Sequence, residues 1–122
     1  MIDWSIIKHF KPAEFACKCG KCGQNLIKPE LVYMLESMRA ELNIPLLINS
    51  GYRCPAWNKQ VGGVSNSPHI TGLAADIACN SGHTRLKIIE WLIMNRVQRI
   101  GIYPSFIHAD LCKDKPLNIW LG

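Results

Sequence analysis

Gly72-Leu73-Ala74-Ala75-Asp76-Ile77-Ala78-Cys79 is the stretch of sequence that decides the fold. Its small apolar residues predict a closely packed strand from Gly72 to Cys79. Asp76 is the exception, because a carboxylate among apolar residues costs free energy unless it is paired or binds a metal. The stretch therefore predicts a buried carboxylate that has a partner.

Two histidines elsewhere in the chain are the expected partners of Asp76. His69 precedes the strand, in the loop that leads into it, and His108 lies in a second apolar strand. Two imidazoles and one carboxylate form a three-ligand zinc set that leaves the fourth position to water, as a catalytic zinc requires. Spacing alone leaves an alternative open, in which Asp76 caps a turn or pairs with a buried arginine and both histidines are ordinary residues.

Helical spacing predicts an amphipathic helix from Lys28 to Asn43. Pro29 stands near its N-terminus, and Pro45 ends it. The residues of its apolar face are Leu31, Leu35, Met38 and Leu42. A short buried strand over residues 46–50 follows the helix.

The second half of the chain predicts another helix and a β-hairpin. Thr84 is the expected cap of this helix, which ends near Arg96. The residues of its inward face are Leu86, Ile89 and Ile93. The strands Arg99–Tyr103 and Phe106–Cys112 are separated only by a Pro-Ser turn, which predicts a hairpin. Segregated helices and strands indicate an α+β fold, a small antiparallel sheet with flanking helices.

The rest of the chain bears on domain organisation. Residues 53–71 are rich in Gly, Pro, Asn and Ser, so they predict a long, ordered surface loop of the kind that often carries function. The sequence has no internal repeat and no low-complexity tract.

A length of 122 residues with 48% hydrophobic composition suits one modest core. We expect a single domain over residues 1–122 and a monomer.

Charge and hydropathy narrow the range of partners. The net charge of +5 favours polyanionic surroundings, but no aromatic stacking platform or nucleic-acid motif accompanies the lysines, so no nucleic-acid partner is expected. No apolar run approaches the ~20 residues that span a bilayer, so no transmembrane segment is expected. The first ten residues lack a basic leader followed by a long apolar run. We therefore expect synthesis in the cytoplasm without a signal peptide.

Six cysteines are unevenly distributed along the chain. The clustered ones are Cys17, Cys19 and Cys22. This cluster suits a knuckle that binds a second, structural zinc with a fourth ligand from elsewhere, or disulfides that form after export. The remaining alternative is reduced thiols that fill gaps, which we favour for Cys79 and Cys112 because free cysteine is often buried.

A series of motifs follows these elements along the chain. They are Ser50-Gly51-Tyr52-Arg53-Cys54-Pro55, Asn58, Val61-Gly62-Gly63-Val64, Asn66-Ser67-Pro68-His69, Gly72-Leu73-Ala74-Ala75-Asp76-Ile77, Gly101-Ile102-Tyr103-Pro104 and His108-Ala109-Asp110. In this order they resemble the motifs of the M15 zinc peptidases. That family includes D-alanyl-D-alanine carboxypeptidases and phage endolysins, and it shares its zinc fold with the hedgehog signalling domain. The segment Phe15-Ala16-Cys17-Lys18-Cys19-Gly20 resembles one M15 subgroup, so the resemblance runs from about Phe10 to Asp110.

The resemblance implies roles for individual residues. It implies that His69, Asp76 and His108 hold zinc and that Arg53 faces the reacting carbonyl, where a guanidinium stabilises an oxyanion. The alternative for Arg53 is a structural arginine that ties down the long loop. Ser67 either binds the substrate peptide or serves as a turn hydroxyl. The aromatic residues that either line the groove or plug glycine turns are Tyr52, Trp57 and Tyr103.

The general base is not where the family usually has it. Many M15 relatives place a Glu, Asp or His two or three residues before the last histidine ligand, where this chain has Phe106 and Ser105. We expect Asp110 to take this role, because side chains alternate along a strand and put His108 and Asp110 on one face. The alternative is that Asp110 orients His108.

Together, these features imply zinc-dependent hydrolysis of peptidoglycan stem peptides, by a DD-carboxypeptidase or an endopeptidase, in cell-wall lysis or remodelling. The hypothesis is that water activated by zinc attacks a peptide carbonyl that zinc and Arg53 polarise. A chain made in the cytoplasm acts on the wall after release, for instance in phage lysis. Two alternatives stay open: a catalytically inactive zinc-containing binding module of the same fold, and a redox or zinc-knuckle protein that uses the clustered cysteines.

Overall fold

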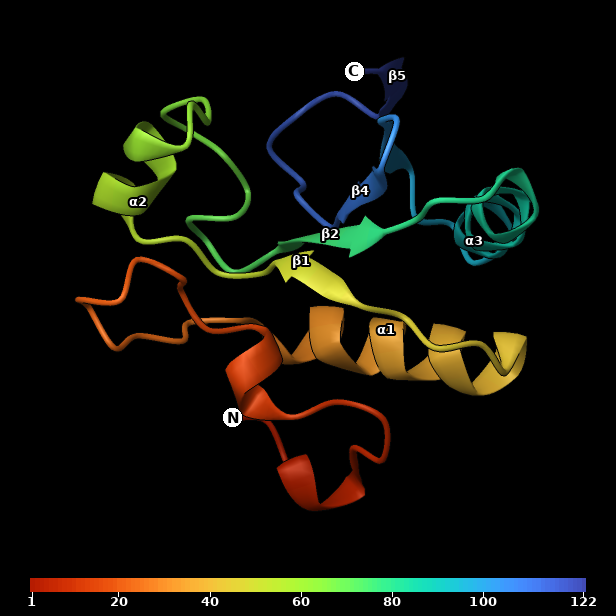
Figure 1. Cartoon of the computed structure of the whole chain (residues 1–122), viewed down its shortest axis with the longest axis horizontal. Helices are drawn as coiled ribbons and strands as arrows, with labels where there is room; N and C mark the ends of the chain where they lie inside the picture. The colour runs from red at the N-terminus through yellow and green to blue at the C-terminus, as the bar shows by residue number, and fades with distance from the viewer.

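Three helices and a five-stranded sheet form the α+β fold that the sequence predicts (Figure 1). The computed structural model describes residues 1–122. The helices are α1 (Pro29–Leu42), α2 (Pro55–Gln60) and α3 (Gly82–Met94), preceded by 3-10 turns at Trp4–Ile6 and Pro12–Glu14. The strands are β1 (Ile48–Ser50), β2 (Ala74–Ala78), β3 (Arg99–Ile102), β4 (Phe106–Asp110) and β5 (Asn118–Leu121).

The strands are ordered β1-β2-β4-β3-β5 across the sheet. The first four pair antiparallel, and β3 and β4 form the predicted hairpin, in which the Tyr103 N–H donates to the Phe106 carbonyl at 3.0 Å. β5 pairs parallel to β3 at the edge. The sheet is therefore mixed, not wholly antiparallel, because the chain after β4 turns back and adds a strand that the sequence analysis does not predict.

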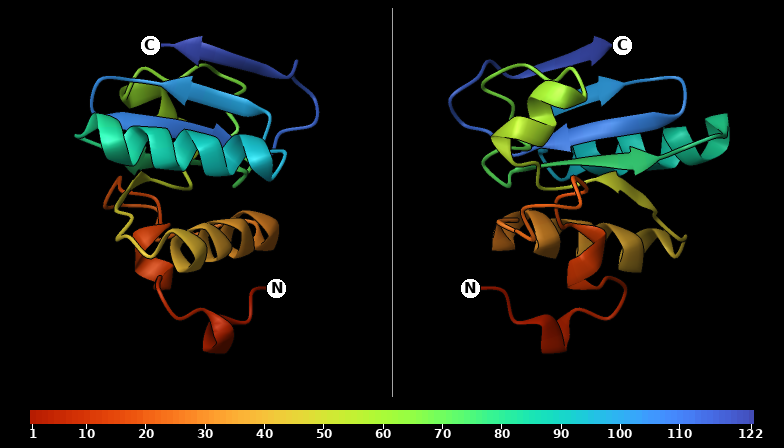
Figure 2. Two further views of the ribbon diagram at one scale, coloured as in Figure 1. Left: turned by 90° about the vertical axis from the view of Figure 1, so that its right-hand side faces the viewer. Right: turned by 60° about the vertical axis from the view of Figure 1, so that its left-hand side comes forward.

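One face of the sheet carries the hydrophobic core. The sheet residues in this core are Ile48, Ala75, Ile77, Ile100, Ile107 and Ala109. Helices α1 and α3 both contribute to it, while α2 lies on the opposite side of the sheet from α3 (Figure 2). Because side chains alternate along a strand, Asp76 and His108 point to the face that the core leaves free.

A row of paired residues crosses the sheet on this second face. Its members, from β1 to β5, are Ser50, Asp76, His108, Gly101 and Trp120. Side chains that are paired across strands point to the same side of a sheet. A Cβ atom on Gly101 would lie 2.7 Å from the Trp120 ring, so the absence of a side chain at this position leaves room for the indole. The row thus sets a carboxylate, an imidazole and an indole side by side.

The helix predictions hold for α1 and fail in part for α3. Leu31, Leu35 and Met38 are fully buried, as expected. In α3 the cap is Ser81, whose Oγ accepts from the Thr84 N–H at 3.1 Å, so Thr84 is not the cap.

The predicted inward face of α3 is wrong for two of its three residues. Leu86 and Ile93 are 61% and 58% exposed, whereas Ile89 is half-buried against the core. The buried residues of α3 are Ile88, Trp91 and Leu92. Between Leu86 and Met94 only Lys87 and Glu90 are polar, so the spacing of apolar residues is compatible with more than one inward face, and packing against the sheet determines which face is buried.

The region 53–71, predicted as a loop, contains the short helix α2. Pro55 occupies its first turn, and Cys54 is its cap, with the Trp57 N–H donating to the Cys54 Sγ at 3.4 Å. No helix of the protein combines the length and the apolar character needed to cross a membrane.

Candidate metal centre

His69, Asp76 and His108 meet on the free face of the sheet. Asp76 on β2 is paired with His108 on β4, and His69 comes from the loop that leads into β2. One ligand atom from each of the three residues lies within 4.8 Å of the other two. The Asp76 Oδ1 is 3.3 Å from the His69 Nε2 and 2.9 Å from the His108 Nδ1. The prediction of a buried, partnered carboxylate is confirmed, because Asp76 is only 6% exposed.

The backbone fixes the tautomer of His69. The His69 Nδ1–H donates to the Gly51 carbonyl at 2.7 Å, so the Nε2 carries a lone pair. This Nε2 is buried and has no hydrogen-bond partner. Its neighbour, the Asp76 Oδ1, is an acceptor too, so their 3.3 Å approach is not a hydrogen bond in this tautomer. A nitrogen lone pair and a carboxylate oxygen that face each other repel, so this arrangement needs a cation between the two atoms.

Asp110 fixes the tautomer of His108 in the same way. A carboxylate only accepts hydrogen bonds, so the His108 Nε2–H donates to the Asp110 Oδ2, at 2.7 Å. In the neutral ring the other nitrogen, Nδ1, faces the Asp76 Oδ1 at 2.9 Å with its lone pair, whereas in the protonated ring it donates to this oxygen. Three acceptor atoms therefore converge on one point, and this donor set fits a divalent cation such as zinc.

The pKa values of the site reflect this crowding. Burial on its own raises the pKa of Asp76, but the His108 hydrogen bond and the close approach of His69 hold it well below its usual range. Burial on its own lowers the pKa of His108, but the hydrogen bonds to Asp110 and Asp76 raise it above its ordinary value. Without a metal, a proton on His108 thus supplies part of the positive charge that the carboxylates demand.

Asp110 is saturated with donors. Its Oδ1 accepts from the Arg99 Nε at 2.7 Å and from the Cys112 N–H at 3.0 Å, and its Oδ2 accepts from His108. The residue is 1% exposed. It contacts His108 on the ring nitrogen that faces away from Asp76. These contacts favour the orienting role for Asp110 over that of general base.

Arg53 borders the centre and is held from three sides. Its NH2 donates to the Asp76 Oδ2 at 3.2 Å, its Nε to the Ser50 Oγ at 3.1 Å and its NH1 to the Asn58 Oδ1 at 3.1 Å. The side chain stays 15% exposed. It therefore ties the loop to the sheet and places the guanidinium beside the Asp76 carboxylate.

The three residues predicted to bind substrate lie in different surroundings. Ser67 is buried, and its Oγ accepts from the His69 N–H at 3.2 Å. Tyr52 is 3% exposed, and its hydroxyl donates to the Gln24 Oε1 at 3.4 Å. Tyr103 is half-buried, stacks on Phe106 with ring centroids 4.3 Å apart, and accepts at its hydroxyl from the Trp120 Nε1 at 3.0 Å. Of the three, Tyr103 lies on the same face of the sheet as His108.

Trp120 and Arg99 belong to the surroundings of the centre, and the sequence analysis does not single them out. The Trp120 ring lies 5.4 Å from the His108 ring, and the Arg99 guanidinium lies 5.2 Å from the Trp120 ring. Trp120 lies on β5, and the residues next to it in that strand are exposed, so no alternation of buried and exposed residues marks the strand. Arg99 had one available signal, its position opposite Asp110 in the predicted hairpin.

A cavity lies beside the centre. It measures about 1200 Å³ and is lined on one side by Ser67 and Asp110, while the three candidate ligands are not in its wall. Its lining has more basic than acidic residues: the basic ones are Lys28, Arg96, Arg99, Lys113 and Lys115, and the acidic ones are Glu30, Asp110 and Asp114. It offers space for an extended ligand next to the candidate metal centre.

Four cysteines form a second group of possible metal ligands. The Sγ atoms of Cys17, Cys19, Cys22 and Cys54 lie within 4.8 Å of one another. Cys54 is the fourth member of this group, a position that the sequence left unassigned because no spacing links Cys54 to the other three. Cys79 is buried and Cys112 half-buried, and both stand apart from this group.

Comparison with known proteins agrees with the motifs. No curated protein matches the chain. The family model described as Peptidase M15 matches residues 8–110, which is most of the chain and includes both histidines and the aspartate of the candidate centre. This match and the convergence of the three side chains place the protein in the peptidase M15 family, a family of metallopeptidases.

Proposed function

We propose that the protein is a zinc-dependent hydrolase of peptidoglycan stem peptides. The observation that carries the proposal is the buried Nε2 of His69, which has no hydrogen-bond partner and faces the Asp76 carboxylate and the second histidine. A structural role leaves such an atom unsatisfied, whereas a metal ligand requires its lone pair. The M15 family match supports a peptide substrate.

In this proposal His69, Asp76 and His108 hold the zinc ion. Zinc in a site with three protein ligands supplies Lewis-acid chemistry, which lowers the pKa of water and polarises a carbonyl. Gly51 and Asp110 hold the two imidazoles in the tautomers that ligation needs. The guanidinium of Arg53 donates to the peptide oxygen as it gains negative charge, in a position set by Asp76 and Asn58.

We assign Asp110 the positioning role toward His108. Its two oxygens already accept three hydrogen bonds, so it has little capacity left for a proton from water. It also contacts the imidazole nitrogen opposite the ligating one. The general-base role predicted for Asp110 is the competing assignment, and the variants described in the Discussion separate the two.

The proposed substrate class rests on charge and space. The basic cavity beside the centre suits the carboxylates of wall peptides and the anionic polymers around them. It has room for a chain end, as in a carboxypeptidase, and for a continuing peptide, as in an endopeptidase. We place the activity at the cell wall, which the protein reaches after release from the cytoplasm.

The test is hydrolysis of purified peptidoglycan fragments by the metal-loaded protein. Cleavage that a chelator stops, that added zinc restores and that His69→Ala abolishes would support the proposal. His83→Ala is the matched control, because His83 is an exposed histidine on α3 and is expected to leave cleavage unchanged. If fully metallated wild type released no peptide or amino acid, the proposal would fall.

A binding module of the same fold is the second candidate. The observation that favours it concerns the position where many M15 relatives carry a general base. Here that position is Phe106, which stacks on Tyr103 and cannot accept a proton. Such a module would bind wall fragments with its zinc retained and would leave them intact. Fragment binding without product release in the same assay identifies this outcome.

A further inference from the structure

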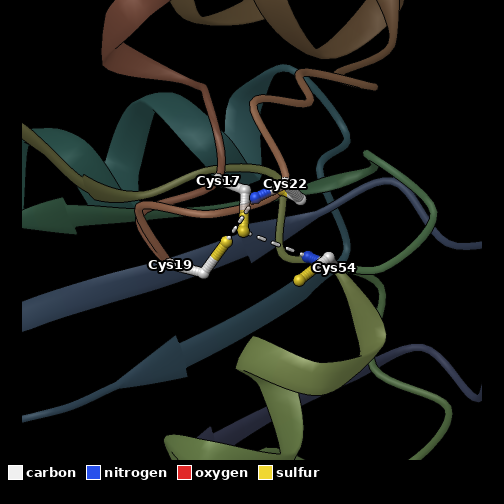
Figure 3. Close-up of side chains that lie close together, drawn as sticks. All are labelled: Cys17, Cys19, Cys22 and Cys54. Atoms are coloured by element: carbon white, nitrogen blue, oxygen red, sulfur yellow. Dashed lines mark hydrogen bonds between the residues drawn. The ribbon is translucent and has the colours of Figure 1, made fainter.

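Four sulfur atoms from two distant parts of the chain meet on one side of the molecule. Cys17, Cys19 and Cys22 come from the N-terminal segment, and Cys54 comes from the start of α2 (Figure 3). All four are free thiols. The first three are only half-buried, so filling the core does not explain why they gather.

The backbone around Cys19 and Cys22 is shaped to point N–H groups at sulfur. The N–H groups of Lys21 and Cys22 donate to the Cys19 Sγ at 3.3 and 3.2 Å, and the Gln24 N–H donates to the Cys22 Sγ at 3.4 Å. Gly20 and Gly23 have φ angles of +75° and +61°, which allow the tight turns between these donors. The turn gathers positive partial charge around two sulfurs.

The other two sulfurs have the same kind of partner. The Cys54 N–H donates to the Cys17 Sγ at 3.3 Å, and the Trp57 N–H donates to the Cys54 Sγ at 3.4 Å. Each of the four sulfurs therefore accepts at least one backbone hydrogen bond. Such bonds stabilise thiolates and orient them, as the outer partners of metal ligands do.

We propose that Cys17, Cys19, Cys22 and Cys54 bind a structural zinc ion that fastens the N-terminal segment to the turn carrying Gly51 and Arg53. Four thiolates are a closed ligand set for zinc, with no position for water, so this second site is structural and not catalytic. It stands whether or not the protein is a hydrolase.

The segments that this zinc would join already lie against each other. The Tyr52 N–H donates to the Phe15 carbonyl at 2.9 Å, and a Cβ atom on Gly51 would lie 2.8 Å from that carbonyl oxygen. The same turn supplies the Gly51 carbonyl to His69 and the Arg53 side chain to Asp76. Zinc at the cysteines thus holds the turn that positions two groups of the candidate metal centre.

Metal analysis of variants purified under reducing conditions tests this inference. Wild type is expected to hold about two zinc ions per chain, and Cys54→Ser and His69→Ala about one each. Cys112→Ser is the matched control, since it changes a half-buried cysteine outside the group and is expected to keep both ions. Full zinc content in Cys54→Ser, or disulfides among the four cysteines in protein that binds no zinc there, overturns the proposal.

A second measurement covers the case in which Cys54→Ser does not fold. Cobalt substituted into wild type is expected to give the intense sulfur-to-cobalt charge-transfer absorption of a tetrahedral thiolate site, which His69→Ala retains. Cys22→His is expected to keep the metal, because three cysteines and one histidine also form a structural zinc set. Absence of that absorption in cobalt-loaded wild type counts against the site. These readouts need no enzymatic activity, so failure here is distinct from failure of the proposed hydrolysis.

Discussion

The imidazole of His108 and the carboxylate of Asp110, two residues apart on β4, are joined by a 2.7 Å hydrogen bond from Nε2–H to Oδ2. Arg99 and the Cys112 N–H hold the other carboxylate oxygen, so Asp110 has little freedom to turn. The proton on Nε2 leaves the Nδ1 lone pair directed at the candidate metal position. One carboxylate thus determines which nitrogen of His108 can bind zinc.

Asp110→Asn is expected to weaken zinc binding at the candidate centre by about 10- to 100-fold. An amide has one acceptor oxygen, and Arg99 and the Cys112 N–H are expected to take it. The amide NH2 then faces His108, so the ring proton moves to Nδ1 and removes the ligating lone pair. Titration with a competing chelator measures the loss.

Asp110→Ala provides the comparison for this amide variant. It removes the orienting group without enforcing the wrong tautomer, so it is expected to bind zinc more tightly than Asp110→Asn and less tightly than wild type. If Asp110 were only a general base, both variants would keep full zinc affinity and lose hydrolysis. That pattern would restore the base assignment.

Arg53→Lys is expected to lower kcat/KM for wall fragments by about 10²- to 10³-fold with zinc content unchanged. Lysine keeps the charge, but it cannot donate to Asp76, Ser50 and Asn58 at once and still present an edge to substrate. Ser50→Ala is the control, because it removes one of the three contacts and is expected to cost less than tenfold. Steady-state kinetics with metal analysis checks both. Near-normal turnover in zinc-loaded Arg53→Lys would reduce Arg53 to an anchor of the loop.

Structure follows from the sequence where a residue has only one environment that is compatible with its chemistry. Asp76 stands among alanines in a buried strand, where a carboxylate without a partner would cost too much free energy. Its two histidine partners are found close to it. Leu31, Leu35 and Met38 share a single apolar face, and all three are fully buried. One-sided patterns leave little for tertiary packing to decide.

Features that depend on long-range pairing have no local signal in the sequence. Residues 118–121 follow Pro116 and are mostly exposed, so nothing local predicts that β5 pairs parallel to β3. Trp120 was missed with it. Cys54 was missed as a partner of the cysteine cluster because residues 23–53 separate it from Cys22, and only the fold brings the two segments together.

Gly101→Ala is expected to destabilise the protein by about 1–3 kcal/mol. The new Cβ would lie 2.7 Å from the Trp120 ring and 2.8 Å from the Tyr103 ring, so the indole must leave its place beside His108. Gly82→Ala is the matched control, because no atom lies within 4 Å of its Cβ position at the start of α3. We expect it to be neutral or stabilising by up to about 1 kcal/mol. Urea denaturation compares the stability of the two variants. Equal midpoints of unfolding would show that Trp120 can move without a loss of stability.

The effect of pH is expected to have opposite sign in the metal-free and zinc-loaded proteins. In the metal-free chain, burial lowers the pKa of His108, but the hydrogen bonds to Asp110 and Asp76 raise it above the ordinary value of 6.5. A folded-state pKa above the unfolded one means that the proton stabilises the fold. This contribution is complete below about pH 6.5 and is lost as the pH rises through the folded-state pKa.

Zinc reverses this dependence because it requires the Nδ1 that the proton occupies. Its affinity for the candidate centre, and the stability it adds, are therefore expected to rise over the same pH range. NMR titration of the His108 ring in metal-free protein gives the pKa, and thermal unfolding with and without zinc gives the two slopes. Asp110→Ala is expected to lower that pKa, since it removes one of the two carboxylates that hold the proton. A metal-free His108 that titrates at or below 6.5 would contradict the hydrogen-bond network on which its tautomer depends.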